Sequence, residues 1–158
     1  MEAQVFAMLS FVLSRNLCQR VVAEVTYGPL LRAFTTSNPK YREATDNVVT
    51  YTQLRTMLSN RDIQLFDVRN PDEYQAGHIP HAVNMPLGNL EESLKLSPEH
   101  FKQRFEVKTP GKDDNNIVFH CKGGNRSAKA LDIAHQLGFS KARHYKGGYA
   151  DWVEQERK

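Results

Sequence analysis

Short apolar runs alternate with helix-like segments along the chain from about residue 48 onward. The runs 63–68 and 117–119 carry apolar residues on consecutive positions, which is typical of strands buried on both faces in a parallel sheet. Three shorter runs are also expected to be extended: 48–50, 83–86 and 142–145. Strands that alternate with short helices predict an α/β fold, a small parallel sheet covered by helices on both faces.

Capping residues mark where the helices of this fold begin. Thr52 is expected to cap a helix over 53–58, and Ser97 to cap a helix over 98–105 that opens with proline. Apolar positions at helical spacing predict a longer helix over 127–137, which a glycine terminates. Two further short helices are expected, one at 71–74 and one around Trp152.

The first 34 residues differ in composition from the rest of the chain. They contain three arginines, two glutamates and no aspartate, and apolar residues recur at helical spacing from Phe6 to Leu17. Basic, acid-poor, amphipathic amino termini are typical of mitochondrial transit peptides. We therefore expect a transit-peptide-like leader at 1–34, a linker at 35–47, a folded domain at 48–158, and a mitochondrial protein, in the matrix.

Two alternatives for the leader stay open. A secretory signal fits less well, because Glu2 stands where a basic segment is expected before the apolar run. A plain tail without a targeting role, on a cytoplasmic protein, is the other alternative.

Composition and charge argue against several classes of protein. The most apolar stretch, 3–13, has 11 residues, whereas a membrane-spanning helix needs about 20, so no membrane span is expected. The net charge is only +3 and the basic residues are scattered, so no nucleic-acid partner is expected. The two cysteines, Cys18 and Cys121, form no CxxC pair, which argues against a disulfide scaffold or a zinc ribbon. We expect a monomer.

The segment that follows the predicted strand at 117–119 carries the candidate chemistry. Cys121 stands at the carboxyl end of that strand, which is where ligands bind in open α/β sheets. The glycine-containing connection allows successive backbone N–H groups to form an anion cradle, and the start of the next helix adds a partial positive charge. Lys122 and Arg126 add two full charges. These features favour the thiolate, so we predict a lowered pKa and a nucleophilic Cys121 rather than an inert buried cysteine.

Three motifs resemble those of the rhodanese family. The segment CKGGNRS at 121–127 is similar to the family's active-site loop, DVRNPDEYQAGHIPHAVNMP at 67–86 to its other signature, and GGYADW at 147–152 to its closing motif. They occur in the family's order and span the chain from about residue 48 to the carboxyl end, so the resemblance implies a rhodanese-like fold. His81 stands where the family commonly has glycine or a small residue, and only a local adjustment of that loop is expected.

The resemblance implies an enzyme, a sulfurtransferase of the thiosulfate (rhodanese) type that needs no cofactor. The Cys121 thiolate would take the outer sulfur from thiosulfate or glutathione persulfide, and the Cys121 persulfide would pass it to cyanide, sulfite or a cellular thiol. Loss of the leader would remove Cys18, so the acceptor would have to be an external nucleophile. Arg126 would pair with the dianionic donor, Lys122 would add charge at the pocket mouth, and Ser127 would form a hydrogen bond within the loop. The implied substrate-binding residues are Lys122, Gly123, Gly124, Asn125, Arg126 and Ser127.

Two other functions stay open at this point. A non-catalytic binding module of the same fold usually lacks the cysteine that this chain has. A small cysteine phosphatase uses a loop one residue longer than the four residues that separate Cys121 from Arg126.

Other polar residues have structural interpretations. Asp67 and Arg69, at a strand end, are interpreted as an ion pair that supports the active-site loop. The histidines His78, His81 and His120 form no metal-ligand motif, so no metal is expected.

Overall fold

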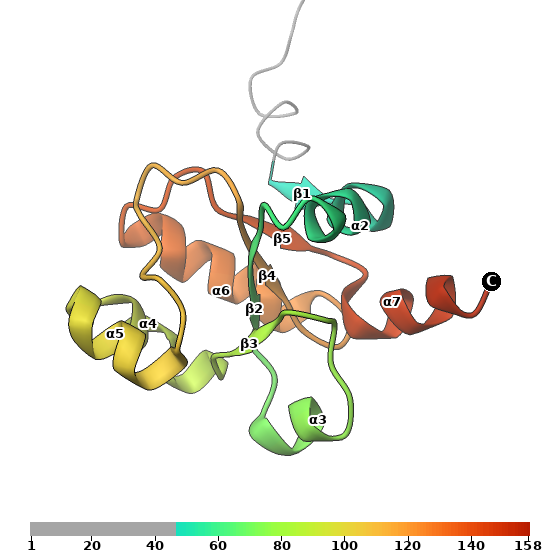
Figure 1. Cartoon of the computed structure of the whole chain (residues 1–158), viewed down its shortest axis with the longest axis horizontal. Helices are drawn as coiled ribbons and strands as arrows, with labels where there is room; N and C mark the ends of the chain where they lie inside the picture. The colour runs from blue at the N-terminus through green and yellow to red at the C-terminus, as the bar shows by residue number, and fades with distance from the viewer. Residues whose placement is uncertain (1–46) are drawn as a thin grey trace, which may run out of the picture. The chain divides into compact units, whose positions relative to one another are not determined.

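The computed structural model of the chain describes residues 47–158. The predicted leader 1–34, and the predicted linker 35–47 except its last residue, lie outside the described residues. The elements in chain order are β1 (Val48–Val49), α2 (Tyr51–Ser59), β2 (Gln64–Asp67), α3 (Pro71–Gln75), β3 (Val83–Asn84), η1 (Leu87–Asn89), α4 (Leu90–Leu94), α5 (Pro98–Phe105), β4 (Ile117–His120), α6 (Asn125–Gln136), β5 (Arg143–Tyr145) and α7 (Gly148–Glu156) (Figure 1).

The strands form one sheet of five in the order β1-β5-β4-β2-β3, and every neighbouring pair is parallel. At its centre β2 pairs with β4 in a register that places Leu65 opposite Val118 and Asp67 opposite His120. The carboxyl ends of these two strands therefore lie side by side. This register brings Asp67, at the end of β2, and Cys121, directly after β4, to the same edge of the sheet.

Helices cover both faces of the sheet, as the sequence predicts. Phe66 and Phe119 pack on one face, in a core that α4, α5 and α6 complete. Leu65 and Val118, one position away on the same strands, pack on the other face against α2 and α7. The two central strands are thus apolar on both sides, which explains their uninterrupted apolar sequence.

The predicted cap of the first helix was wrong. Helix α2 begins at Tyr51 and Thr50 is its N-cap, two residues before the expected Thr52. The reason is the capping box: the Thr50 hydroxyl accepts the N–H of Gln53, and the Gln53 side chain accepts the N–H of Thr50. Only a cap three residues before Gln53 allows both bonds.

Two other helices differ from the predicted ones. Helix α6 begins at Asn125, two residues before the predicted start, because Gly124 caps it from a left-handed conformation with φ +94°. The short helix α4, which buries Leu90 and Leu94, was not predicted. Within residues 47–158, no helix combines the length and the apolar character that crossing a membrane requires.

Candidate active site

The thiol of Cys121 lies in a cradle formed by the loop that joins β4 to α6. The residue is buried, with 2% exposure. The backbone N–H of Gly124 donates to Cys121 Sγ at 3.1 Å, and the Ser127 hydroxyl oxygen lies 3.8 Å from the same sulfur. The Ser127 hydroxyl also donates to the Gly124 carbonyl at 2.9 Å, so it ties the first turn of α6 to the loop.

The pKa of Cys121 lies below its usual value, as predicted. Burial acts to raise this pKa, but hydrogen bonds from the N–H groups of Ser127, Gly123 and Gly124 and from the Ser127 hydroxyl outweigh it. The main stabilisation of the thiolate therefore comes from fixed backbone amides. The sequence analysis also expects a contribution from the charges of Lys122 and Arg126, but these are not the main cause. Fixed amides keep their orientation, so they stabilise charge at no cost of rearrangement.

The start of α7 holds this loop in place. The N–H of Tyr149 donates to the Cys121 carbonyl at 2.7 Å, and the N–H of Ala150 donates to the Lys122 carbonyl at 3.0 Å. The approach is close because Gly148 has no side chain: a Cβ there would lie 2.7 Å from the Lys122 oxygen and nearer still to the Cys121 oxygen. The closing motif of the sequence thus acts on the active-site loop.

Arg126 is engaged by a carboxylate from another element. Its Nη1 and Nη2 donate to Glu73 Oε2 and Oε1 at 2.5 and 2.9 Å, and both side chains are about one-third or less exposed. Hydrogen bonding by Arg126 holds the pKa of Glu73 down at about 2. The sequence analysis expects Arg126 to bind the anionic sulfur donor and gives Glu73 no role. Two parallel N–H···O bonds leave the Nε–H and one proton on each Nη available for a second acceptor.

Asp67 and Arg69 form a buried ion pair, as the sequence predicts. Arg69 Nη2 lies 2.5 Å from Asp67 Oδ2, and the two side chains are 3% and 0% exposed. The same guanidinium donates to the Gly77 carbonyl at 2.8 Å and lies over the Tyr149 ring, 4.4 Å from its centroid. The N–H of Tyr149 donates to the Cys121 carbonyl, so contacts connect the ion pair to the loop through α7.

The other predicted site residues differ in exposure. Lys122, Gly123 and Asn125 are exposed, whereas Gly124 is buried. The loop thus presents Lys122 and Asn125 to solvent above the cradle. None of the described residues from 47 to 158 contributes to a cluster of three or more His, Cys, Asp or Glu that could hold a metal ion.

The sequence analysis does not single out His144, and it considers His120 only as a metal ligand. His144 on β5 is 8% exposed, and its Nδ1 lies 3.2 Å from the Ser127 hydroxyl oxygen, so it contacts the group that contacts the sulfur. His120 is fully buried beside Asp67, and burial lowers its pKa to about 4, so it is neutral at pH 7. Only the sheet register, which places β5 next to β4, brings His144 to the loop.

Comparison with known proteins decides the family. The model of the family described as rhodanese-like domain matches residues 50–155. This chain belongs to the rhodanese-like domain family.

Several relatives of this rhodanese-like chain carry names that state an activity. The mouse thiosulfate sulfurtransferase/rhodanese-like domain-containing protein 3 is 43% identical over 72% of this chain and 72% of its own length. The human thiosulfate:glutathione sulfurtransferase is 38% identical over 68% of this chain and 94% of its own length. A putative mitochondrial thiosulfate sulfurtransferase of Schizosaccharomyces pombe is 35% identical over 66% of this chain and 72% of its own length.

A solved structure agrees with the fold. The human single-domain sulfurtransferase TSTD1 superposes with a TM-score of 0.67 at 37% identity, and the match covers 69% of this chain and 96% of the other. The predicted family, the rhodanese-like fold and the predicted class of enzyme, a sulfurtransferase, are confirmed by these comparisons.

Proposed function

We propose that this chain transfers a sulfane sulfur from thiosulfate to a low-molecular-weight thiol through a persulfide on Cys121. In the first step the Cys121 thiolate attacks the outer sulfur of thiosulfate. A bond forms between the two sulfurs, the bond to the sulfonate sulfur breaks, and sulfite leaves with the electron pair. In the second step a thiolate attacks the outer sulfur of the persulfide, takes it, and releases the Cys121 thiolate.

The observation that carries this proposal is the cradle of N–H groups around a buried thiol. In the first step it stabilises the attacking thiolate. In the second step the same amides stabilise the thiolate that leaves, so one arrangement serves both half-reactions. The persulfide carries a negative charge at neutral pH comparable to that of the thiolate, and the cradle suits it for the same reason.

The charges at the mouth of the loop favour an anionic donor. We assign the sulfonate of thiosulfate to the loop N–H groups and to the exposed Lys122, with Arg126 sharing its guanidinium between Glu73 and the donor. Glutathione is the acceptor we favour, because the human relative described above is named a thiosulfate:glutathione sulfurtransferase. Glutathione persulfide is the alternative donor.

The assay of thiocyanate formation from thiosulfate and cyanide tests the activity. Wild-type protein is expected to form thiocyanate, and the Cys121→Ala variant is expected to form none. Mass spectrometry of the intact protein after thiosulfate treatment should show the added mass of one sulfur atom in the wild type only. A wild type that forms no more thiocyanate than Cys121→Ala, with no added sulfur, would contradict the proposal and favour a binding module. Hydrolysis of an aryl phosphate that is lost in Cys121→Ser would favour a phosphatase.

We also propose that residues 1–34 direct this protein to the mitochondrion, where they are removed. The proposal rests on their basic, acid-poor, amphipathic sequence and on the relative that is named mitochondrial. Amino-terminal sequencing of the protein isolated from cells tests it. A chain that begins near residue 35 in the mitochondrial fraction is expected, and a chain intact from Met1 in the cytosol would contradict it.

A further inference from the structure

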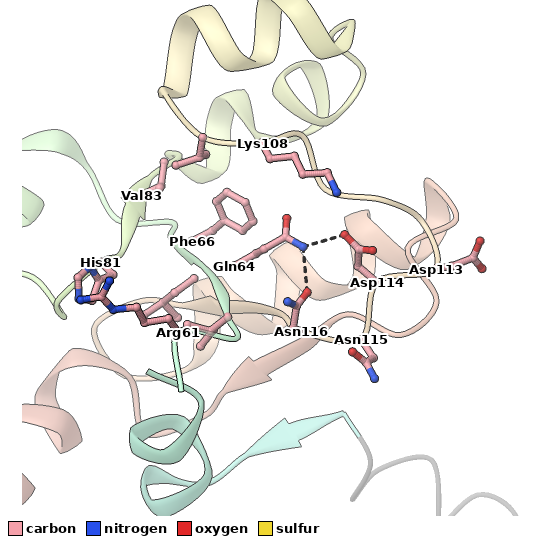
Figure 2. A pocket seen from close by; sticks show the side chains of 13 residues that line it. Arg61, Gln64, Phe66, His81, Val83, Lys108, Asp113, Asp114, Asn115 and Asn116 are labelled. Atoms are coloured by element: carbon pink, nitrogen blue, oxygen red, sulfur yellow. Dashed lines mark hydrogen bonds between the residues drawn. The ribbon is translucent and has the colours of Figure 1, made fainter. Parts of the chain in front are cut away.

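A polar cavity of about 510 Å³ lies at the edge of the sheet opposite Cys121. It is formed around the start of β2, the turn before β3 and the loop before β4, whereas Cys121 follows the end of β4 (Figure 2). Cavities of this volume commonly hold small organic ligands. The sulfur-transfer mechanism makes no use of it.

The side chain of Gln64 lines this cavity in a fixed orientation, and its amide oxygen, Oε1, accepts no hydrogen bond within residues 47–158. Its Nε2 donates to Asp114 Oδ2 at 2.7 Å and to Asn116 Oδ1 at 2.9 Å. Asn116 is itself oriented, since its Nδ2 donates to Asp62 at 2.9 Å. Both partners of Gln64 are acceptors, so its amide cannot be reversed. Oε1 is left buried without a hydrogen-bond partner among the described residues, and Figure 2 shows it directed away from Asp114 and Asn116.

Basic and acidic side chains both line the cavity. The side chains of Arg61, His81 and Lys108 line it, and none of these three side chains makes a hydrogen bond or an ion pair with another residue of 47–158, although the charge of Lys108 helps to lower the pKa of Asp114. Asp114, by contrast, already accepts from Gln64 and from the N–H of Gly111 at 2.8 Å. The carboxylate of Asp113 points away from the cavity in Figure 2.

Two of these basic residues stand on backbone that favours glycine. Arg61 ends the Schellman motif after α2 with φ +54°, where its N–H donates to Leu58. His81 has φ +63° at the third position of a turn closed by a bond from Ala82 to Ile79, where glycine is favoured. Local strain of this kind persists where a side chain has a function. Both strained positions direct a basic side chain to the same cavity.

We propose that this cavity binds a small carboxylate of the amino-acid type. Its carboxylate would be bound by Arg61 and His81, which lie close together in Figure 2, and its ammonium or amide N–H would donate to Gln64 Oε1. A fully deprotonated inorganic anion such as sulfate has no donor for Oε1, and a simple cation would be repelled by Arg61 and Lys108. A zwitterionic ligand satisfies both features.

The matched probes L-glutamate and glutarate test the site, since they differ only in the ammonium group. Each is titrated into the ¹⁵N-labelled full chain and followed by NMR chemical shifts. We expect L-glutamate to shift the Gln64 side-chain amide and the backbone amides of His81 and Lys108 saturably, with no shift at Gly123 or Gly124. Glutarate carries more negative charge but lacks the donor, and it should bind at least about tenfold more weakly.

Glycine substitutions separate binding from folding. The double variant Arg61→Gly, His81→Gly removes one cation and one imidazole and relieves two strained positions, so it should melt at a higher temperature yet bind L-glutamate at least about tenfold more weakly. Glu106→Gly is the control, because Glu106 also has a positive φ, +60°, but its side chain does not line the cavity. It should also melt at a higher temperature and bind L-glutamate as the wild type does.

Three outcomes would overturn the proposal. The first is the absence of saturable shifts at Gln64, His81 and Lys108. The second is that glutarate binds as tightly as L-glutamate, which would remove the role of Oε1. The third is unchanged binding of L-glutamate in the double variant.

Discussion

At the scale of single residues, Cys121 combines burial with a stabilised charge. Burial alone makes a cysteine less acidic, yet here the pKa of the thiol lies below its usual value because backbone N–H groups donate to the sulfur and the Ser127 hydroxyl lies beside it. The acidity of this thiol therefore depends on the geometry of its neighbours more than on their charge.

Removal of one donor should raise the pKa of the thiol. In Ser127→Ala the backbone N–H groups remain but the hydroxyl beside Sγ is lost, so the thiolate is less stabilised. The rate of alkylation of Cys121 by iodoacetamide, measured against pH, should rise at higher pH than in the wild type. In concentrated denaturant, where the cradle is absent, the two proteins should show the same profile. Coincident profiles in the folded state would contradict the role of Ser127.

The Glu73–Arg126 ion pair predicts how stability depends on pH. The folded pKa of Glu73 is about 2, below the ordinary 4.5, so the pair stabilises the fold fully above about pH 4.5 and loses this effect as pH falls towards 2. Because the pair is partly exposed, we expect Glu73→Gln to cost about 1–2 kcal/mol of unfolding free energy at pH 7, with a smaller difference at pH 3.

Urea unfolding of both proteins at the two pH values measures this difference. Asp72→Asn on the same helix turn is the control, since Asp72 makes no ion pair within residues 47–158, and it should change stability by no more than about 0.5 kcal/mol. A difference for Glu73→Gln that stays constant between the two pH values would count against the ion pair as its source.

At the scale of elements, the first turn of α7 holds the active-site loop through a glycine. Gly148 has φ +64°, and a Cβ there would collide with the carbonyl oxygens of Cys121 and Lys122. Gly148→Ala should therefore lower the unfolding free energy by at least about 2 kcal/mol and displace the cradle, so that thiocyanate formation falls together with stability.

The loop itself supplies the matched control for this substitution. Gly123 has open space where a Cβ would lie, and its N–H is retained in alanine. Gly123→Ala should keep stability within about 0.5 kcal/mol of the wild type. Equal losses in the two variants, measured by thermal unfolding and the thiocyanate assay, would show that α7 does not hold the loop.

Local signals explain what the sequence could predict. The two central strands were recognisable because both faces are apolar, and Cys121 was recognisable because glycines and cations follow a strand end. Contacts between distant segments were not visible: Glu73 and Arg126 are 53 positions apart, and only the fold brings them together. The cap lies at Thr50 and not at Thr52 because Gln53, three residues after Thr50, completes a capping box with it.

At the scale of the whole molecule, the two cores that flank the sheet are built from residues after Val48. The residues of one core lie between Phe66 and Ala142 in the sequence, and those of the other lie between Val49 and Trp152. The family match, 50–155, covers the same part of the chain. The described domain thus has a hydrophobic core on each face of the sheet.

A chain shortened to residues 35–158 is therefore expected to keep both the fold and the activity. Its unfolding free energy should lie within about 0.5 kcal/mol of the full-length value, because every core residue of the described part, 47–158, is retained. Its rate of thiocyanate formation should be unchanged, since the loop, Glu73 and α7 all remain. Chemical unfolding and the thiosulfate–cyanide assay on both proteins measure this. A shortened chain that folds equally well but loses activity would show that the first 34 residues act on the site at Cys121, which a leader destined for removal would not do.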